Sequence, residues 1–308
     1  MDRVVLDPEV AAALDAMPPM RFNAETVPAI RANRAAMLTF ELGDAVERTD
    51  HVVRAAPELV VRVHRPRGVT TPLPCVYSIH GGGYVIGTCL QDDPRFDVWS
   101  AGIPCIGASV EYRLAPETPY PGPLDDCYDG LRWIHEHHEE LGIDPDRIGI
   151  AGLSAGGGLA AALALLARDR AEIPLAFQLL ECPMLDDRQQ TSSSRRDGLP
   201  VWSRESNEFG WRSYLGDLYG SDDVPELAAP ARARDLTNLP PTLLIVGGAD
   251  GFRDEDIEYA LRLSQSGVAT ELHVLPGVPH GVQLAVGSSA AKRWRALVDD
   301  WVRGQLAG

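Results

Sequence analysis

Cysteine is scarce in this chain of 308 residues, and its spacing does not suit a metal site or a disulfide framework. The five cysteines include no CxxC pair, and their number is odd. Cys75, Cys105 and Cys182 lie in apolar runs, where a thiol is typically a reduced core residue. We therefore expect no disulfides, no cysteine-bound metal and a cytoplasmic location.

Positive charge is also in short supply, with 28 Lys and Arg against 44 Asp and Glu and a formal net charge of -16. This balance counts against nucleic acid and anionic membranes as partners, because both attract basic surfaces. No apolar run approaches the ~20 residues of a membrane helix. The first residues lack the basic and apolar segments of a signal peptide. The expected partner is a small dissolved molecule, and a homodimer is left open.

What the chain does have is a regular alternation of strand-like and helical segments after residue 58. The expected strands are 59–64, 75–79, 105–110, 147–151, 176–180, 243–246 and 271–275, and the expected helices are 124–138, 155–166, 255–266 and 290–303. Such alternation predicts an α/β fold with a mostly parallel central sheet and helices on both faces.

Two segments depart from this alternation. Residues 1–45 are rich in alanine with helical spacing, and residues 189–234 carry several aromatic residues without strand patterning. The second segment is too long for a plain loop. We predict that both form a helical cap on a catalytic domain made of residues 46–188 and 235–308. Trp202 and Trp211 are the candidate substrate-binding rings of this cap, because aromatic side chains can wall off a pocket.

The motif Gly152-Leu153-Ser154-Ala155-Gly156 lies where an apolar strand turns into an apolar helix. Glycines on either side of a serine permit a tight turn that lifts the hydroxyl out of the sheet edge. This placement is typical of the nucleophile elbow of an acyl-transfer enzyme. We therefore predict Ser154 as the nucleophile.

A serine hydroxyl needs a base and a group that orients the base, and in this type of fold they follow in the order acid, then histidine. His280 lies on a loop after the last strand, and Asp250 ends the strand 244–249. They are the predicted base and acid. The acids at 254–256 fall on the next helix start, where a helix-dipole role suffices. The other histidines are interpreted as solvated or as packing residues, and a metal site at 135–138 is not expected.

Backbone donors for an oxyanion are predicted at two places. His80-Gly81-Gly82-Gly83 follows an early strand, and three glycines in a row allow N–H groups to converge. The N–H of Ala155, next to the nucleophile, would complete the hole.

These motifs together resemble the hormone-sensitive lipase family of α/β-hydrolases, in its bacterial esterase branch, and are similar to bacterial heroin esterases. The resemblance rests on residues 80–83, 112–117, 152–157, 250–255 and 280–281. It implies an α/β-hydrolase fold with a helical cap and a carboxylesterase acting on short- to medium-chain acyl or aryl esters without a cofactor. It assigns the triad to Ser154, Asp250 and His280, and the oxyanion donors to Gly82, Gly83 and Ala155.

The chain departs from this family at three positions. The family usually has Asp before the serine, Asn after the two glycines that follow it, and Pro after the acid. Here these positions hold Leu153, Gly158 and Gly251. An amidase or deacetylase with the same triad stays open, and so does a ligand-binding member without catalysis. Every triad position is filled, which favours an enzyme.

Overall fold

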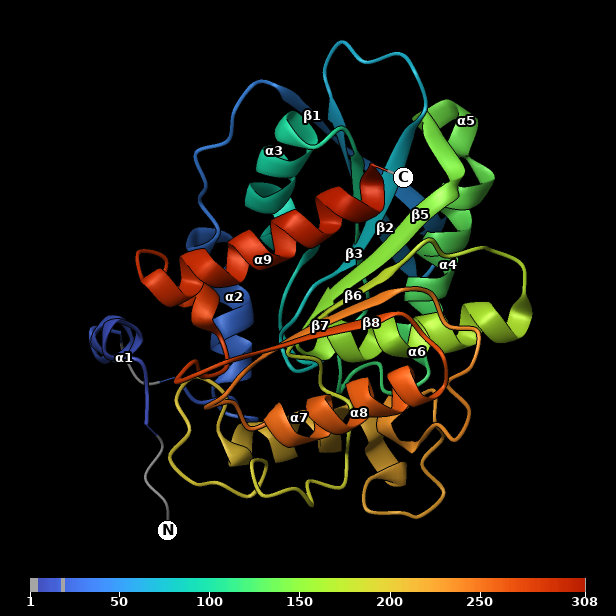
Figure 1. The fold of residues 1–308 in the computed structure, drawn as a ribbon. Helices are drawn as coiled ribbons and strands as arrows, with labels where there is room; N and C mark the ends of the chain where they lie inside the picture. Colours follow the sequence, from blue (N-terminus) through green and yellow to red (C-terminus); the bar gives the residue numbers. More distant parts are fainter. Residues whose placement is uncertain (1–4, 18–19, 308) are drawn as a thin grey trace.

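The computed structural model describes residues 5–17 and 20–307, and an eight-stranded sheet is its centre (Figure 1). The strands follow the order β1-β2-β4-β3-β5-β6-β7-β8 across the sheet. Their bounds are β1 Val46–Ala55, β2 Glu58–Pro66, β3 Leu73–Ile79, β4 Ile106–Glu111, β5 Ile143–Leu153, β6 Gln178–Glu181, β7 Thr242–Gly247 and β8 Thr270–Leu275. Strand β2 is antiparallel to β1 and β4, and the remaining pairs are parallel. The predicted mostly parallel sheet is therefore confirmed.

Helices cover both faces of this sheet. Figure 1 shows α3 and α9 on one face and α4, α6 and α8 on the other. The helices are α1 Pro8–Asp15, α2 Val27–Met37, α3 Asp93–Gly102, α4 Gly122–Glu136, α5 His138–Leu141, α6 Ala155–Arg170, α7 Arg204–Leu215, α8 Arg253–Gln265 and α9 Ser289–Leu306. The 3-10 turns are η1 Cys89–Asp92, η2 Gly216–Leu218, η3 Pro230–Arg232 and η4 Val282–Leu284. Because both faces are covered, β3 and β7 are buried at every residue, which explains their unbroken apolar runs.

Strand β1 and the helices α3 and α5 were not predicted. Strand β1 is an edge strand whose sequence, VERTDHVVRA, is mostly polar, and only Val46 within it is buried. Charged residues are common on edge strands because they prevent pairing with other chains, so the apolar alternation that identifies a strand is missing. In α3 the apolar residues Phe96 and Trp99 face the sheet, but the helix has only a short apolar stripe.

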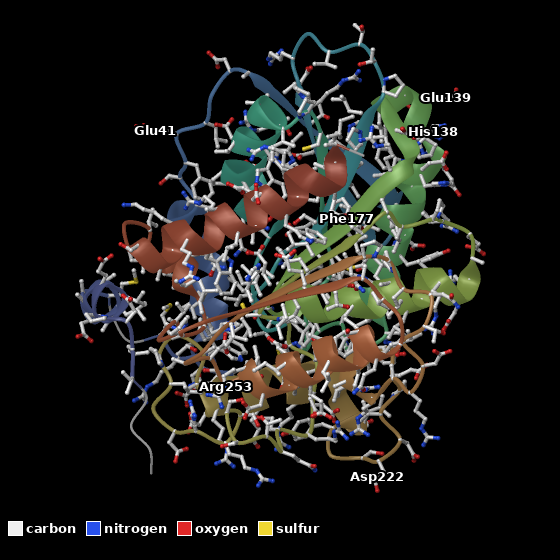
Figure 2. All side chains as sticks on the ribbon, in the orientation of Figure 1. Glu41, His138, Glu139, Phe177, Asp222 and Arg253 are labelled. Atoms are coloured by element: carbon white, nitrogen blue, oxygen red, sulfur yellow. The ribbon has the colours of Figure 1, made fainter. Side chains whose placement is uncertain are left out.

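One continuous hydrophobic core joins the sheet to the helices on both of its faces. Figure 2 shows Phe177 in the packed centre of the molecule, whereas Glu41, Glu139 and Asp222 lie at its periphery. The five cysteines are buried and free in the structure. Within the described residues, no helix is both long and apolar enough to cross a membrane.

Two histidines differ from their predicted surroundings. His64 is fully buried, and its Nε2 lies 2.7 Å from Asp93 Oδ1, so it has a carboxylate partner that no motif indicated. His273 was expected to pack within a strand, but it lies in the edge strand β8 and bonds Glu271 at 2.6 Å. Glu271 and His273 are two positions apart in β8, so their side chains lie on the same face of the strand and can bond each other.

The N-terminal segment and the 189–234 segment meet beyond the carboxyl ends of the parallel strands (Figure 1). The rings of Phe22 and Trp202 pack with their centroids 5.2 Å apart, and the Phe22 N–H donates to Ser206 Oγ. Helix α1 contacts α9 and η4 of the catalytic part instead. Within residues 189–234 the structure forms one α-helix, α7, whose N-cap Ser203 accepts from the Ser206 N–H.

Candidate active site

Ser154 occupies a sharp turn between β5 and α6. Its backbone has φ 58° and ψ -119°, a conformation that is strained for a residue with a side chain. The turn is held by the Ser154 N–H, which donates to Glu181 O at 2.8 Å, and by the Ser154 carbonyl, which accepts from Met184 N at 2.9 Å. A Cβ on Gly152 would lie 2.1 Å from Gly156 O, and one on Gly156 would lie 2.0 Å from Ile79 O. Glycine is therefore required on both sides of the serine.

The structure brings together the three residues predicted for the triad. Ser154 Oγ lies 2.9 Å from His280 Nε2, and His280 Nδ1 lies 2.8 Å from Asp250 Oδ2. The other carboxylate oxygen, Oδ1, accepts the Phe252 N–H at 3.0 Å. The exposed fractions are 5% for Ser154, 8% for His280 and 2% for Asp250. A hydroxyl bonded to an imidazole, which is itself oriented by a buried carboxylate, can deliver a nucleophilic oxygen to an acyl carbon.

The glycine loop after β3 lies beside this serine. Gly82 and Gly83 both have positive φ angles, 126° and 59°, and the Gly82 carbonyl accepts the N–H groups of Val85 and Ile86. A Cβ on Gly81 would lie 3.4 Å from the Ser154 Cβ, so the loop and the nucleophile are in contact. Ala155 is the first residue of α6, where backbone N–H groups have no partner within the helix. The glycine loop thus contacts the nucleophile through Gly81, and Ala155 lies at the N-terminus of α6, where the helix dipole favours negative charge.

The two candidate substrate-binding rings take different places. Trp202 lies over the glycine loop, since a Cβ on Gly83 would be 2.0 Å from its ring, and its centroid is 6.4 Å from that of His280. The Trp202 Nε1 donates to Asn207 Oδ1 at 3.2 Å, which fixes the plane of the ring. Trp211 is fully buried and packs against Tyr84, with centroids 5.5 Å apart. Of the two candidate rings, Trp202 therefore borders the triad, whereas Trp211 packs within the cap.

The acids at the start of α8 do more than complement its dipole. Glu255 is buried and accepts the N–H groups of Leu185 and Asp186, so it ties α8 to the segment after β6. Asp256 is fully buried, and neither of its oxygens has a hydrogen-bond partner among the described residues. Burial, joined by the charges of Glu255 and Asp250, raises the pKa of Asp256. The expectation of a simple helix-dipole role was too narrow, because sequence does not show that these carboxyls face inward.

The described residues include one group with the spacing of metal ligands, Cys182, Asp250 and His280, whose atoms lie within 4.8 Å of one another. Two of these residues are already hydrogen-bonded to each other. Burial raises the pKa of the Cys182 thiol, whereas a metal ligand must be a thiolate. Asp250 and His280 are therefore better suited to act as a hydrogen-bonded catalytic pair than, together with Cys182, as metal ligands.

A buried ion pair behind the nucleophile was not predicted. The Glu181 side chain is 1% exposed; its Oε1 lies 2.5 Å from Arg95 Nη2, and its Oε2 accepts from Trp294 Nε1 at 2.6 Å. Glu181 ends β6 and pairs in register with Leu153. The sequence signal for Glu181 was the position of an acid at the end of an apolar strand. The partners of Glu181, however, come from α3 and α9, which are far away in sequence.

The structure explains one departure from the family elbow. A Cβ on Gly158 would lie 2.2 Å from Met184 O and 2.8 Å from Tyr84 Oη. Tyr84 is buried and its hydroxyl donates to the same Met184 carbonyl at 3.3 Å. The Met184 carbonyl and the Tyr84 hydroxyl therefore leave no room for a Cβ at position 158.

Comparison with known proteins agrees with this geometry. Residues 76–284 match the family described as alpha/beta hydrolase fold. A carboxylesterase of Mycobacterium tuberculosis, NlhH, is 39% identical over 246 residues, which cover 78% of this chain and 77% of the relative. An arylesterase of Saccharolobus solfataricus is 35% identical over 69% of both chains.

Solved structures are similar over nearly the whole chain. A bacterial heroin esterase superposes with a TM-score of 0.93 at 44% identity, covering 98% of both chains. A hyperthermophilic esterase from the archaeon Pyrobaculum calidifontis superposes with a TM-score of 0.86 at 28% identity, covering 99% of this chain and all of the other. The similarity extends to both segments outside the sheet.

Proposed function

Because the chain belongs to the hormone-sensitive lipase family of α/β-hydrolases, we propose that it is a serine carboxylesterase. The observation that carries this proposal is the hydrogen-bonded series Ser154, His280 and Asp250 at a strained elbow. Relatives named as esterases support the reaction class.

In the proposed mechanism, His280 removes the Ser154 proton while Oγ attacks the acyl carbon. Asp250 holds the imidazole and stabilises the imidazolium that forms. The N–H groups of Gly82, Gly83 and Ala155 bind the oxyanion. The imidazolium then protonates the leaving alcohol, which leaves an acyl group on Ser154. A water molecule activated by His280 releases the acid and restores the serine.

The substrates are proposed to be short- to medium-chain acyl or aryl esters. Trp202 supports this size limit, because its ring borders both the glycine loop and the catalytic base. Each methylene that fits beside such a wall gains about 0.8 kcal/mol of burial, and further carbons gain nothing and add strain. We expect good turnover of acetyl to hexanoyl esters and almost none of palmitoyl esters. Trp211 stays a substrate-binding proposal with weaker support, since it lies within the cap packing.

We also propose a division of the chain into a cap and a catalytic domain. Residues 1–45 and 189–234 would form the cap, which the contact between Phe22 and Trp202 supports. The free buried cysteines support a cytoplasmic location. A homodimer is also proposed, because the edge strand β8 exposes Leu272 and Val274.

The test measures hydrolysis of p-nitrophenyl esters from acetate to palmitate by the wild type and by Ser154→Ala, with fluorophosphonate labelling of both proteins. We expect Ser154→Ala to remain folded, to lose labelling and to lower kcat on the order of 10⁴- to 10⁶-fold. Retention of a tenth of the activity would refute the nucleophile. Matched ester and amide substrates separate an esterase from an amidase, and an unlabelled, inactive wild type would indicate a ligand-binding protein.

A further inference from the structure

Arg31 of helix α2 places its guanidinium between two loops of the catalytic part. Its Nε donates to Val85 O at 2.6 Å, its Nη2 to Ala115 O at 2.5 Å and its Nη1 to Glu117 Oε1 at 2.8 Å. The Arg31 side chain is 23% exposed, whereas that of Glu117 is 65% exposed. The two carbonyl bonds therefore lie on the inner side of the guanidinium, and the ion pair lies at the rim.

The first of these carbonyls belongs to the turn that follows the glycine loop. The Val85 N–H donates to Gly82 O at 3.1 Å and the Ile86 N–H donates to the same oxygen at 3.0 Å, so residues 82–86 form one tight turn. A Cβ on Gly82 would lie 2.2 Å from Ile86 O, which shows how closely the turn is packed. A constraint on the Val85 carbonyl is therefore transmitted to the peptides of Gly82 and Gly83.

The second carbonyl belongs to a segment that is joined to the same turn. The Ala115 N–H donates to Tyr84 O at 2.9 Å, and its carbonyl accepts from Arg31. Arg31, Ala115 and residues 84–85 thus form a closed hydrogen-bonded ring. Arginine suits this role because its donors are fixed in one plane, so three acceptors can be held in a defined geometry.

We propose that Arg31 is a positioning residue that holds the Gly82–Gly83 turn in the geometry required to bind the oxyanion. Helix α2, which lies outside the sheet, would thus supply a residue that positions the oxyanion donors. The inference rests on the proposed esterase function and on the roles of Gly82 and Gly83 within it. It attributes to Arg31 no contact with the substrate.

The glycine donors act on charge that develops only in the transition state, so a displaced turn lowers kcat more than it changes KM. Removal of one oxyanion donor costs on the order of 10²- to 10³-fold in kcat. A donor that is displaced rather than removed costs less, and for Arg31→Met we expect about a 10- to 100-fold loss of kcat with KM within about twofold.

The experiment uses the full chain and compares Arg31→Met, Arg31→Lys and Glu117→Gln with the wild type. It measures kcat and KM for p-nitrophenyl butyrate and the inhibition constant of a reversible trifluoromethyl ketone, whose tetrahedral adduct places an oxyanion in the hole. Fluorophosphonate titration counts folded active sites. We expect Arg31→Met to weaken the ketone by the same factor as kcat. Glu117→Gln removes only the exposed ion pair, so its constants should stay within twofold of the wild type.

Arg31→Lys keeps the charge but cannot reach three acceptors, and we expect it to be intermediate. If Arg31→Met does not fold, Arg31→Lys and rescue of Arg31→Ala by millimolar guanidinium provide the same comparison. Unchanged kcat and ketone affinity in the folded variants would overturn the proposal, and so would a rise in KM alone. These results are distinct from failure of the esterase function, in which the wild type itself would not hydrolyse the esters.

Discussion

Replacement of Arg95 by methionine would leave the buried carboxylate of Glu181 without its cation. The Glu181 side chain is 1% exposed and that of Arg95 is 23% exposed; Glu181 Oε1 forms an ion pair with Arg95, and its Oε2 accepts from Trp294. Breaking a buried ion pair by removal of one partner costs about 3–5 kcal/mol, because the remaining charge is uncompensated. Methionine retains most of the aliphatic stem, so loss of packing adds little. We expect Arg95→Met to lower the free energy of unfolding by about 3–5 kcal/mol.

Glu181→Gln should have opposite effects on stability in the wild type and in the Arg95→Met background. In the wild type this change costs about 1–3 kcal/mol, because the arginine loses its carboxylate and faces an amide. In the Arg95→Met background it removes the uncompensated charge, while the glutamine oxygen still accepts from Trp294. Only the amide NH₂ is then unpaired, at a cost of about 1–3 kcal/mol. Adding Glu181→Gln should therefore restore about 2 kcal/mol to Arg95→Met, so the effect of one substitution changes sign between two backgrounds.

Urea unfolding followed by tryptophan fluorescence measures all four proteins of this cycle, with equal m-values as the check that the unfolded states are comparable. Independent sites give free energies that add within about 0.5 kcal/mol. If Glu181→Gln costs the same in both backgrounds within that limit, the ion pair does not hold the strand end and the reasoning is wrong.

Three further predictions follow from the site and its surroundings. The raised pKa of the buried Asp256 means that the native state keeps a proton that the unfolded chain releases above about pH 4, so stability falls as the pH rises. Asp256→Asn cannot titrate, and urea midpoints at pH 5 and pH 8 should show a larger gain for this variant at pH 8; equal gains would contradict it. Trp202→Ala should move the acyl-chain optimum to longer esters, by up to about fourfold in kcat/KM for each carbon newly accommodated, and an unchanged optimum would place the size limit elsewhere. Dialysis against EDTA should leave turnover unchanged, and a loss of activity that zinc reverses would mean that Cys182, Asp250 and His280 hold a metal.

Much of the fold and the centre of the site could be predicted because they depend on local signals. Buried parallel strands form short apolar runs, so β3, β5 and β7 were found within a few residues. The elbow needs glycines at fixed positions around Ser154, and Asp250 and His280 follow the ends of strands. A serine, an acid and a histidine in this order therefore indicated where three distant segments would meet.

The remaining features depend on contacts that sequence spacing does not encode. Glu181 is bonded by residues of α3 and α9, and Arg31 bonds carbonyls more than fifty positions away. Carbonyl acceptors have no sequence signature at all, since every residue carries one. The inward orientation of Asp256 depends on the rotation of α8 against the sheet, and the edge strand β1 lacks an apolar pattern.

The contact between Trp202 and Gly83 bears on how such enzymes diversify. A Cβ on Gly83 would lie 2.0 Å from the indole, so the cap and the glycine loop are fitted to each other across one van der Waals surface. A cap segment with a larger side chain at this place would clash with the loop below, and one with a smaller side chain would leave a void. Exchange of the cap between family members should therefore require compensating changes near Gly83. The cap, which limits substrate size, and the glycine loop should accordingly change together in evolution.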